Sequence, residues 1–403
     1  MLIEKILWHY DDITVVPKAV SKVNSRKTLN PYYRGYGSKR RNVLPIFASP
    51  MAAVVNKENM KCFWEHNVIP ILPRTFDINE RLEKAKEEEW IAVSLDEFVE
   101  YFTKPNDFID SIDKPTTLYV LIDIAQGHML QTIDFVNKAR EFESMLKDKK
   151  FVIMVGNIAE PEYISYILYN HVDIDYIRLC IGQGQCCITS PQTAINYPPA
   201  SLVSESYKIT STFKKNHPNA KIPYLVADGG IKSYNHIIKA LSLGADFVMI
   251  GTMLSSLYES ASDFYQYYDR NHCFEPIVSI NSIDSKYSID NEEMKKEYIM
   301  SGEIYKRNFG MSTPEAQKAI DATKESRLTE GLVRYIPCIK TLKMWHDELV
   351  GYMKSCMSYL GIFNIDKIQE ESRCYIMSPN ASKAINKPAD NMINNPNFFV
   401  ISE

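Results

Sequence analysis

Eight short apolar runs, each rich in β-forming residues, recur along residues 44–250 and most constrain what this chain can fold into. Between most of them lies a stretch with helical periodicity and charged faces. Strands that alternate with helices pair in parallel through right-handed crossovers, and eight such units close a (β/α)8 barrel. Strands buried on both faces read as continuous apolar runs, as these do.

We therefore predict an α/β fold, a (β/α)8 TIM barrel. An open doubly wound sheet is the alternative, because periodicity alone does not count strands reliably. The predicted strands are Leu44–Ala48, Val68–Leu72, Trp90–Ser94, Leu118–Ile122, Phe151–Val155, Asp175–Leu179, Pro223–Ala227 and Asp246–Ile250. The helical stretches include Asn56–Glu65, Asn79–Glu88, Gln131–Leu146, Glu160–Tyr169 and Ser233–Leu243.

The segments that follow the predicted strands would share one rim of the barrel, where such barrels keep their active sites. Nearly every glycine of the barrel region falls in these segments, together with small polar residues. A barrel with a purely structural role would not need them there, so we predict that this rim is functional. The segments are 49–54, 73–75, 123–128, 156–160, 181–189, 228–233 and 251–256.

One of these segments, IGQGQCCIT at residues 181–189, carries two adjacent cysteines. Gly182 and Gly184 allow a tight turn, and Cys186 and Cys187 follow it. A thiol on a glycine-rich turn directly after a strand is well placed to be a nucleophile, because the turn exposes it while the strand fixes it. On this segment alone, the alternative that the cysteines are small buried hydrophobes stays open.

The composition argues against several other classes of protein. A net charge of -4 gives no electrostatic reason to expect nucleic acid or an acidic membrane surface as a partner. The eight cysteines form no CxxC pair and no metal-ligand cluster, which favours a reduced compartment over a zinc site or a disulfide framework. The N-terminus has no signal-peptide pattern, and no apolar run approaches the ~18 residues of a membrane span. We therefore predict a cytoplasmic protein.

The regular alternation stops after the eighth predicted strand. Residues 257–305 are rich in Tyr, Ser, Asp and Asn without a clear period, and we expect an insertion packed over or beside the rim, within an insertion and flap region at 257–332. An amphipathic helix is predicted at Leu342–Leu360. We assign residues 1–364 to a single catalytic domain. Residues 365–403 are polar and rich in Asn and Pro, and we expect a mobile or loosely docked tail.

Several separated segments together resemble the IMP dehydrogenase / GMP reductase family over roughly residues 9–362. Each is weak by itself, and their shared order and spacing carry the resemblance. The small regulatory domain that many dehydrogenases insert after the second strand is missing. The matching segments are DDITVVP (11–17), SR (25–26), LPIFASPM (44–51), IDIAQGHM (122–129), VGNIA (155–159), IGQGQCCIT (181–189), VADGGIKSYNHIIKALSLGADFVMIGTML (226–254), FGMS (309–312), RLTEG (327–331) and SYLG (358–361).

The resemblance implies a barrel that binds a purine mononucleotide with a nicotinamide stacked beside it. Its cysteine, which falls on Cys187 and not Cys186, would attack C2 of the base, and Thr189 falls on the family's threonine. The chemistry is reasonable, because a carbon between two ring nitrogens is electrophilic and a thiolate can add to it and later leave. A homotetramer is also implied.

The resemblance also assigns ligand contacts at the rim. Asp228 suits ribose hydroxyls because a carboxylate accepts their hydrogen bonds. For Asp228, and likewise for Asp123, the alternative is an acid at a helix N-terminus. The implied nucleotide contacts are Ser49, Met51, Asp228, Gly229, Gly230, Gly251, Thr252, Met311, Ser312, Arg327 and Gly331. The implied nicotinamide side is Asp123, Ala125, Gly127 and Asn157. A monovalent cation, potassium, would bind at Gly182, Gly184 and the Cys187 carbonyl.

The segment 313–329 distinguishes the two branches of the family. The dehydrogenases hydrolyse their covalent intermediate with an Arg-Tyr pair on a flap, and this segment contains no Arg-Tyr dipeptide and no tyrosine. It is more similar to GMP reductase, in which Glu330 would work with Thr189 to deliver a proton to the leaving 2-amino group while NADPH gives hydride to C2. The alternative for Glu330 is a surface acid.

Two other functions stay open at this point. One is IMP dehydrogenase, which oxidises IMP to XMP with NAD. The other is a non-catalytic purine-nucleotide-binding barrel, because Gln185, Ser190 and Ala52 depart from the family's pattern around the site. The choice between NADPH and NADH is open as well.

Overall fold

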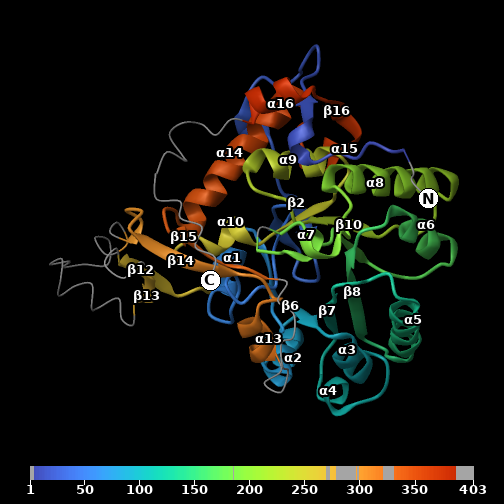
Figure 1. Ribbon diagram of the computed structural model, residues 1–403. Coiled ribbons are helices and arrows are strands. Elements are labelled where there is room, and N and C mark those ends of the chain that lie inside the picture. The colour runs from blue at the N-terminus through green and yellow to red at the C-terminus, as the bar shows by residue number, and fades with distance from the viewer. Residues whose placement is uncertain are drawn as a thin grey trace.

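The computed structural model describes residues 4–184, 186–268, 273–277, 296, 299–320 and 331–386. Eight parallel strands close into a barrel in the order β10-β11-β4-β5-β6-β7-β8-β9, near the centre of Figure 1. The predicted (β/α)8 barrel is confirmed and the open sheet is wrong, because β11 pairs with β4. The barrel strands are β4 (Ile46–Ala48), β5 (Ile69–Leu72), β6 (Trp90–Val93), β7 (Thr116–Asp123), β8 (Lys149–Ile158), β9 (Tyr176–Leu179), β10 (Tyr224–Asp228) and β11 (Phe247–Ile250).

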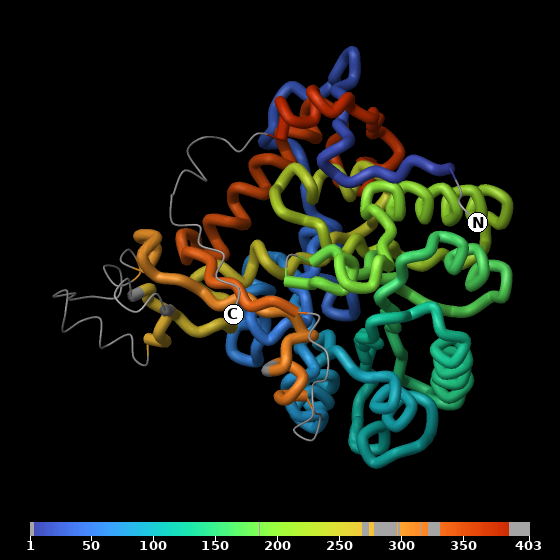
Figure 2. Tube along the Cα trace, in the orientation of Figure 1, coloured from blue at the N-terminus to red at the C-terminus, as the bar shows by residue number. Residues whose placement is uncertain are grey.

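Helices follow most of the strands and surround the barrel (Figures 1 and 2). Their ends carry ordinary helix signals: Ser94 and Glu97 form a capping box at the start of α3, and Gly361 in the left-handed conformation ends α14. The last of them, α14, has the predicted bounds. These helices are α1 (Met60–Glu65), α2 (Ile78–Lys86), α3 (Leu95–Phe102), α4 (Asp107–Asp110), α5 (Leu130–Met145), α6 (Pro161–Tyr169), α7 (Thr189–Thr193), α8 (Pro199–Asn216), α9 (Tyr234–Ser242), α10 (Thr252–Ser255) and α14 (Leu342–Leu360).

The core has two layers because successive strand residues point to opposite faces. In β4, Ile46 and Ala48 belong to the cluster shared with the helices, whereas Phe47 belongs to a separate inner cluster. Inside the barrel, the ring of Phe47 meets those of Trp90 and Tyr176 edge-on, with centroids 5.5 and 6.0 Å apart. Large side chains therefore fill the barrel and leave the rim as the place for a ligand.

A four-stranded antiparallel sheet stands beside the barrel, and part of it comes from the predicted insertion at 257–305. The sequence of 257–305, which has no clear period, led us to assign no strands there. Aromatic residues such as Phe264 and Tyr265 favour strands, but their partners come from distant positions, which no local period reveals. The elements here are β12 (Phe264–Tyr268), β13 (Cys273–Pro276), β14 (Ile304–Phe309), α13 (Pro314–Ile320) and β15 (Val333–Pro337), with the sheet order β13-β12-β14-β15.

The C-terminal segment 365–386 packs against the N-terminal segment, as the neighbouring red and blue elements in Figures 1 and 2 show. β16 (Arg373–Ile376) pairs antiparallel with β1 (Ile13–Val16). Ile365 and Ile368 are 1% and 2% exposed. The expectation of a loosely docked tail is therefore wrong for 365–386. The segment is polar on average, but Ile365 and Ile368 are three positions apart and both are buried. Residues 387–403 lie outside the described residues.

The remaining elements are short. They are η1 (Tyr10–Asp12), η2 (Arg26–Thr28), β2 (Tyr33–Tyr36), β3 (Arg41–Val43), η3 (Ile365–Lys367), α15 (Ile368–Glu371) and α16 (Pro379–Ile385). None of the helices in the described part of the chain is both long and apolar enough to cross a membrane. The assignment of 1–364 to a single domain stays a prediction.

The packing of the C-terminal segment gives a stability prediction. Ile368→Ala removes a buried side chain and should lower the free energy of unfolding by about 2–5 kcal/mol, measured by urea denaturation. The matched control is Ile385→Ala in the same segment, where the side chain is 56% exposed and the change should stay within about 0.5 kcal/mol. Equal losses for the two variants would contradict the described docking.

Candidate active site

A cavity of about 440 Å³ opens at the rim, lined by the carboxyl ends of β7, β8 and β10 and by the segments that follow β4, β5, β7, β9, β10 and β11. Residues 310–312, which follow β14, complete its wall. Most of the residues proposed from the sequence line this cavity, so the closed barrel brings them together. They are Ser49, Met51, Asp123, Ala125, Asn157, Gly182, Gly184, Cys187, Thr189, Asp228, Gly229, Gly230, Gly251, Thr252, Met311 and Ser312.

Two of the proposed residues that the structure describes, Gly127 and Gly331, are not among those that line the cavity. Gly127 donates its N–H to the carbonyl of Asn157, a lining residue, at 2.8 Å. Gly331 pairs with Cys187 through an isolated antiparallel bridge. Arg327 and Glu330 lie outside the described residues, so their roles stay predictions.

The segment after β9 presents Cys187 to the cavity. The Cys187 N–H donates to the Gly184 carbonyl at 3.0 Å, which closes a tight turn. The Cys187 thiol donates to the Thr189 hydroxyl at 3.2 Å, and its side chain is only partly buried. A carbonyl oxygen has two lone pairs, so Gly184 keeps one with which a cation could be held. The structure therefore brings the Cys187 thiol and the Thr189 hydroxyl together, a contact that the sequence did not predict.

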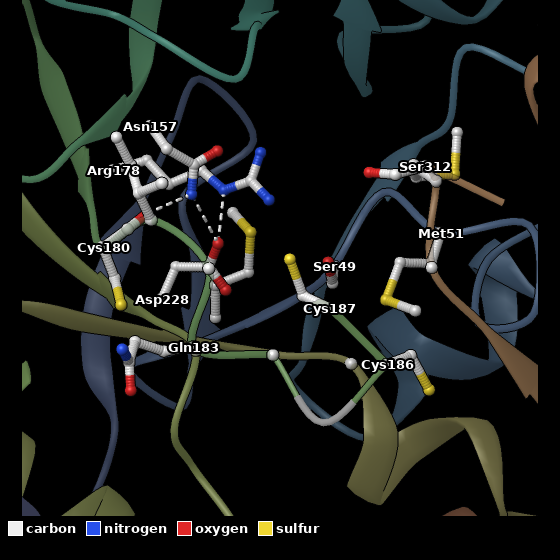
Figure 3. A pocket seen from close by; sticks show the side chains of 18 of the residues that line it. Ser49, Met51, Asn157, Arg178, Cys180, Gln183, Cys186, Cys187, Asp228 and Ser312 are labelled. Carbon is white, nitrogen blue, oxygen red and sulfur yellow. Dashed lines mark hydrogen bonds and ion pairs between the residues drawn. The ribbon is translucent and has the colours of Figure 1, made fainter. Parts of the chain in front are cut away.

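The neighbouring cysteine points elsewhere, as Figure 3 shows. Cys186 is 4% exposed, and its sulfur accepts from the side-chain amide of Asn308 at 3.0 Å. The same amide reaches the Thr252 hydroxyl at 3.2 Å. Burial raises the pKa of the Cys186 thiol to about 11. Cys186 therefore anchors the segment to β14, while Cys187 faces the cavity. Sequence reasoning missed Asn308, which carries no local signal.

The two proposed carboxylates flank an arginine that sequence reasoning also missed. Arg178 donates through Nε to Asp228 Oδ2 and through Nη1 to Asp123 Oδ1, both at 2.6 Å. Burial would lower the pKa of Arg178, but the carboxylates of Asp228 and Asp123 outweigh burial and raise that pKa above its ordinary value. Figure 3 shows Arg178 beside Asp228. The available signal was one charged residue inside the otherwise apolar run at 176–180.

The alternative that these carboxylates are helix N-terminal acids is wrong. Asp228 ends β10, whereas α9 begins at Tyr234. Asp123 ends β7, whereas α5 begins at Leu130. The helix dipole acts within about one turn, and neither carboxylate belongs to the first turn of its helix. Both carboxylates instead pair with Arg178 and line the cavity.

The cavity glycines after β10 and β11 are required for two reasons, a positive φ and a close side-chain contact. Gly229 and Gly230 have φ of +82° and +72°, a region that other residues rarely adopt. A Cβ on Gly251 would lie 2.6 Å from the Met51 sulfur. The N–H of Gly230 donates to the Gln183 carbonyl at 2.9 Å, so in this structure it is not directed at a ligand.

The backbone has an uncommon conformation at Cys180, just before the turn that carries Cys187. Cys180, the first residue after β9, has φ of +109° although it is not a glycine. Such conformations store strain and persist only where the surrounding structure enforces them. The Asn157 side-chain amide donates to the Cys180 carbonyl at 2.6 Å. The thiol is 3% exposed, and burial raises its pKa well above the ordinary value.

Comparison with known proteins agrees with this architecture. A sequence profile of the IMP dehydrogenase / GMP reductase domain matches residues 107–386. GMP reductase 2 of Mus musculus is 23% identical over 371 residues, which cover 90% of this chain and 91% of that protein. GMP reductase of Staphylococcus carnosus is 25% identical over 90% of this chain and 94% of its own length.

A second kind of relative appears in the same comparison. Inosine-5'-monophosphate dehydrogenase of Chlorobaculum parvum is 26% identical over 297 residues, which cover 72% of this chain and 51% of that protein. The profile match extends over more than half of the chain. The chain therefore belongs to the IMP dehydrogenase / GMP reductase family.

Proposed function

We propose that this protein is an NADPH-dependent GMP reductase, which converts GMP to IMP and ammonia through a covalent bond between Cys187 and C2 of the purine. The observation that carries the proposal is the Cys187 thiol 3.2 Å from the Thr189 hydroxyl within the rim cavity. Gly331, the sequence neighbour of Glu330, pairs with Cys187. The bridge thus joins the two segments to which the proposed proton-transfer residues belong.

Two observations favour reductase over dehydrogenase. The segment 313–329 has no tyrosine and no Arg-Tyr dipeptide with which to activate water. The alignment also covers 91% and 94% of the two GMP reductases described above, but only 51% of the dehydrogenase. The match thus extends over nearly the whole length of the two reductases.

The proposed reaction begins with the thiolate of Cys187. It adds to C2 of GMP and forms a carbon–sulfur bond. Thr189 and Glu330 relay a proton to the 2-amino group, the carbon–nitrogen bond breaks, and ammonia leaves. NADPH supplies the hydride that C2 then accepts. The carbon–sulfur bond breaks last, which releases IMP and restores the thiolate.

The lining residues fit two ligands that meet above Cys187. We assign the nucleotide to the side of Asp228, with Ser49, Met51 and Thr252 near its ribose and phosphate. The nicotinamide lies on the side of Asp123. The further nucleotide contacts that we propose are Gly229, Gly230, Gly251, Met311, Ser312, Arg327 and Gly331, where Gly230 contributes close approach and not its N–H. The further nicotinamide contacts are Ala125, Gly127 and Asn157.

Three further assignments accompany this function. Potassium would be held by backbone carbonyls at Gly182, Gly184 and Cys187, the last two of which meet in one turn. A homotetramer and a cytoplasmic location stay predictions. The cation assignment is chemically consistent, because peptide carbonyl oxygens suit a hard monovalent ion.

The first test follows absorbance of the reduced nicotinamide with GMP and NADPH. The wild-type protein should oxidise NADPH and release ammonia, and Cys187→Ala should lose about 10³-fold or more in kcat because it lacks the nucleophile, with little change in GMP affinity. Cys186→Ala is the matched control: it removes a contact with Asn308 but not the nucleophile, so it should lose far less turnover. Reduction of NAD with IMP would support a dehydrogenase, and binding without turnover a non-catalytic barrel. An active Cys187→Ala beside an inactive Cys186→Ala would overturn the assignment of the nucleophile.

A second test compares the reactivity of the cysteines toward iodoacetamide at pH 8, followed by peptide mass spectrometry. The thiolate is the reactive form, and a pKa of about 11 leaves Cys186 almost entirely protonated at this pH. Burial likewise raises the pKa of Cys180. We expect Cys187 to be alkylated first, with protection by GMP. Faster labelling of Cys186 would contradict the described burial.

A further inference from the structure

A single buried guanidinium ties together both sides of the rim cavity. Arg178 lies on β9, and its side chain is 11% exposed. It contacts Asp228 at the end of β10 and Asp123 at the end of β7. The four strands are neighbours in the order β7-β8-β9-β10. From β9, the Arg178 side chain therefore reaches the adjacent strand β10 and, past β8, the strand β7.

The barrel makes room for this arginine. Gly156 on β8 lies opposite Arg178 in the strand register. A Cβ on Gly156 would lie 2.4 Å from the Cβ of Arg178 and 2.8 Å from its carbonyl oxygen. No real side chain tolerates such distances, so any residue other than glycine would force β8 and β9 apart. The position of Arg178 is therefore built into the sheet.

The contacts leave both carboxylates able to receive a ligand. Arg178 engages Oδ2 of Asp228 and Oδ1 of Asp123, and Asp228 Oδ2 also accepts from the Asn157 side-chain amide at 3.2 Å. Within the described part of the chain, the other oxygen of each carboxylate has no hydrogen-bond partner. Both residues line the cavity. Ligand hydroxyls that bind these oxygens would thus contact groups whose orientation is set by the same cation.

We propose that Arg178 is a positioning residue that couples the two half-sites, so that occupation of one favours binding at the other. The inference rests on the proposed function, in which Asp228 serves the nucleotide and Asp123 the nicotinamide side. When one ligand fixes its carboxylate, Arg178 and hence the other carboxylate lose freedom before the second ligand arrives. Coupling of this kind is reciprocal, and each ligand raises the affinity for the other by the same factor.

The test measures equilibrium binding by calorimetry for GMP, for NADP⁺ and for each in the presence of the other, a pair that does not react. In Arg178→Lys, a single ammonium cannot reproduce the planar fork that reaches both carboxylates. We expect both affinities to fall about tenfold and the mutual enhancement to disappear. Asp228→Asn should weaken GMP binding and Asp123→Asn should weaken NADP⁺ binding, each mainly on its own side.

The matched control is a second buried arginine outside the cavity. Arg81 on α2 is 3% exposed and pairs with Glu97 at 2.6 Å. Arg81→Lys should lower the melting temperature and leave both affinities and their coupling unchanged. If Arg178→Lys behaves in the same way, the role of Arg178 is only structural and the inference is overturned.

These binding measurements do not depend on turnover, so the two proposals can fail separately. A wild-type protein that binds both ligands with coupling but does not oxidise NADPH would overturn the reductase proposal and leave the role of Arg178 standing. If the wild type turns over and Arg178→Lys keeps wild-type binding and coupling, the reductase proposal stands and the role of Arg178 is overturned. A wild-type protein that binds neither ligand would overturn both.

Discussion

The hydrogen bonds between β11 and β4 close the sheet, and the arrangement of the rim depends on them. They pair Val248, Met249 and Ile250 with the three residues of β4. At the rim, the Ser49 N–H donates to the Ile250 carbonyl at 3.0 Å, and Gly251 leaves space for the Met51 side chain. In an open sheet, the segments after β4 and β11 would lie at opposite edges. Closure is what places them in the same cavity, because all carboxyl ends of a parallel barrel share one ring.

The segment that carries the cysteines is held from two directions. From below, β9 pairs with β8 and β10 in the wall of the barrel. From the side, Asn308 of β14 holds the Cys186 sulfur, and the Leu332 N–H donates to the Cys186 carbonyl at 2.8 Å. Asn308 is fully buried, and a buried polar side chain is costly unless it is hydrogen-bonded. The small sheet therefore contributes to the site, since it fixes the residue next to the proposed nucleophile.

Much of the barrel was predictable because its strands are short apolar runs that differ from their surroundings. The strand at Trp90–Val93 is one residue shorter than predicted, and the helix at Leu342–Leu360 matches. The small sheet was not predictable, since β14 must find β12 and β15 across long stretches of chain. Nor was the docking of 365–386, where Ile368 is buried in a helix that contacts α9 and α14.

By itself the sequence determined that strands and helices alternate, that glycines and polar residues follow the strands, and that Cys187 lies on a turn directly after one of them. These properties are local, because propensity and periodicity act over a few residues. Only the tertiary structure decided which charged groups face one another. Arg178 meets Asp123 and Asp228 across 55 and 50 positions of sequence. A charge inside a barrel is stable only beside opposite charges, and the closed register of the strands is what supplies them.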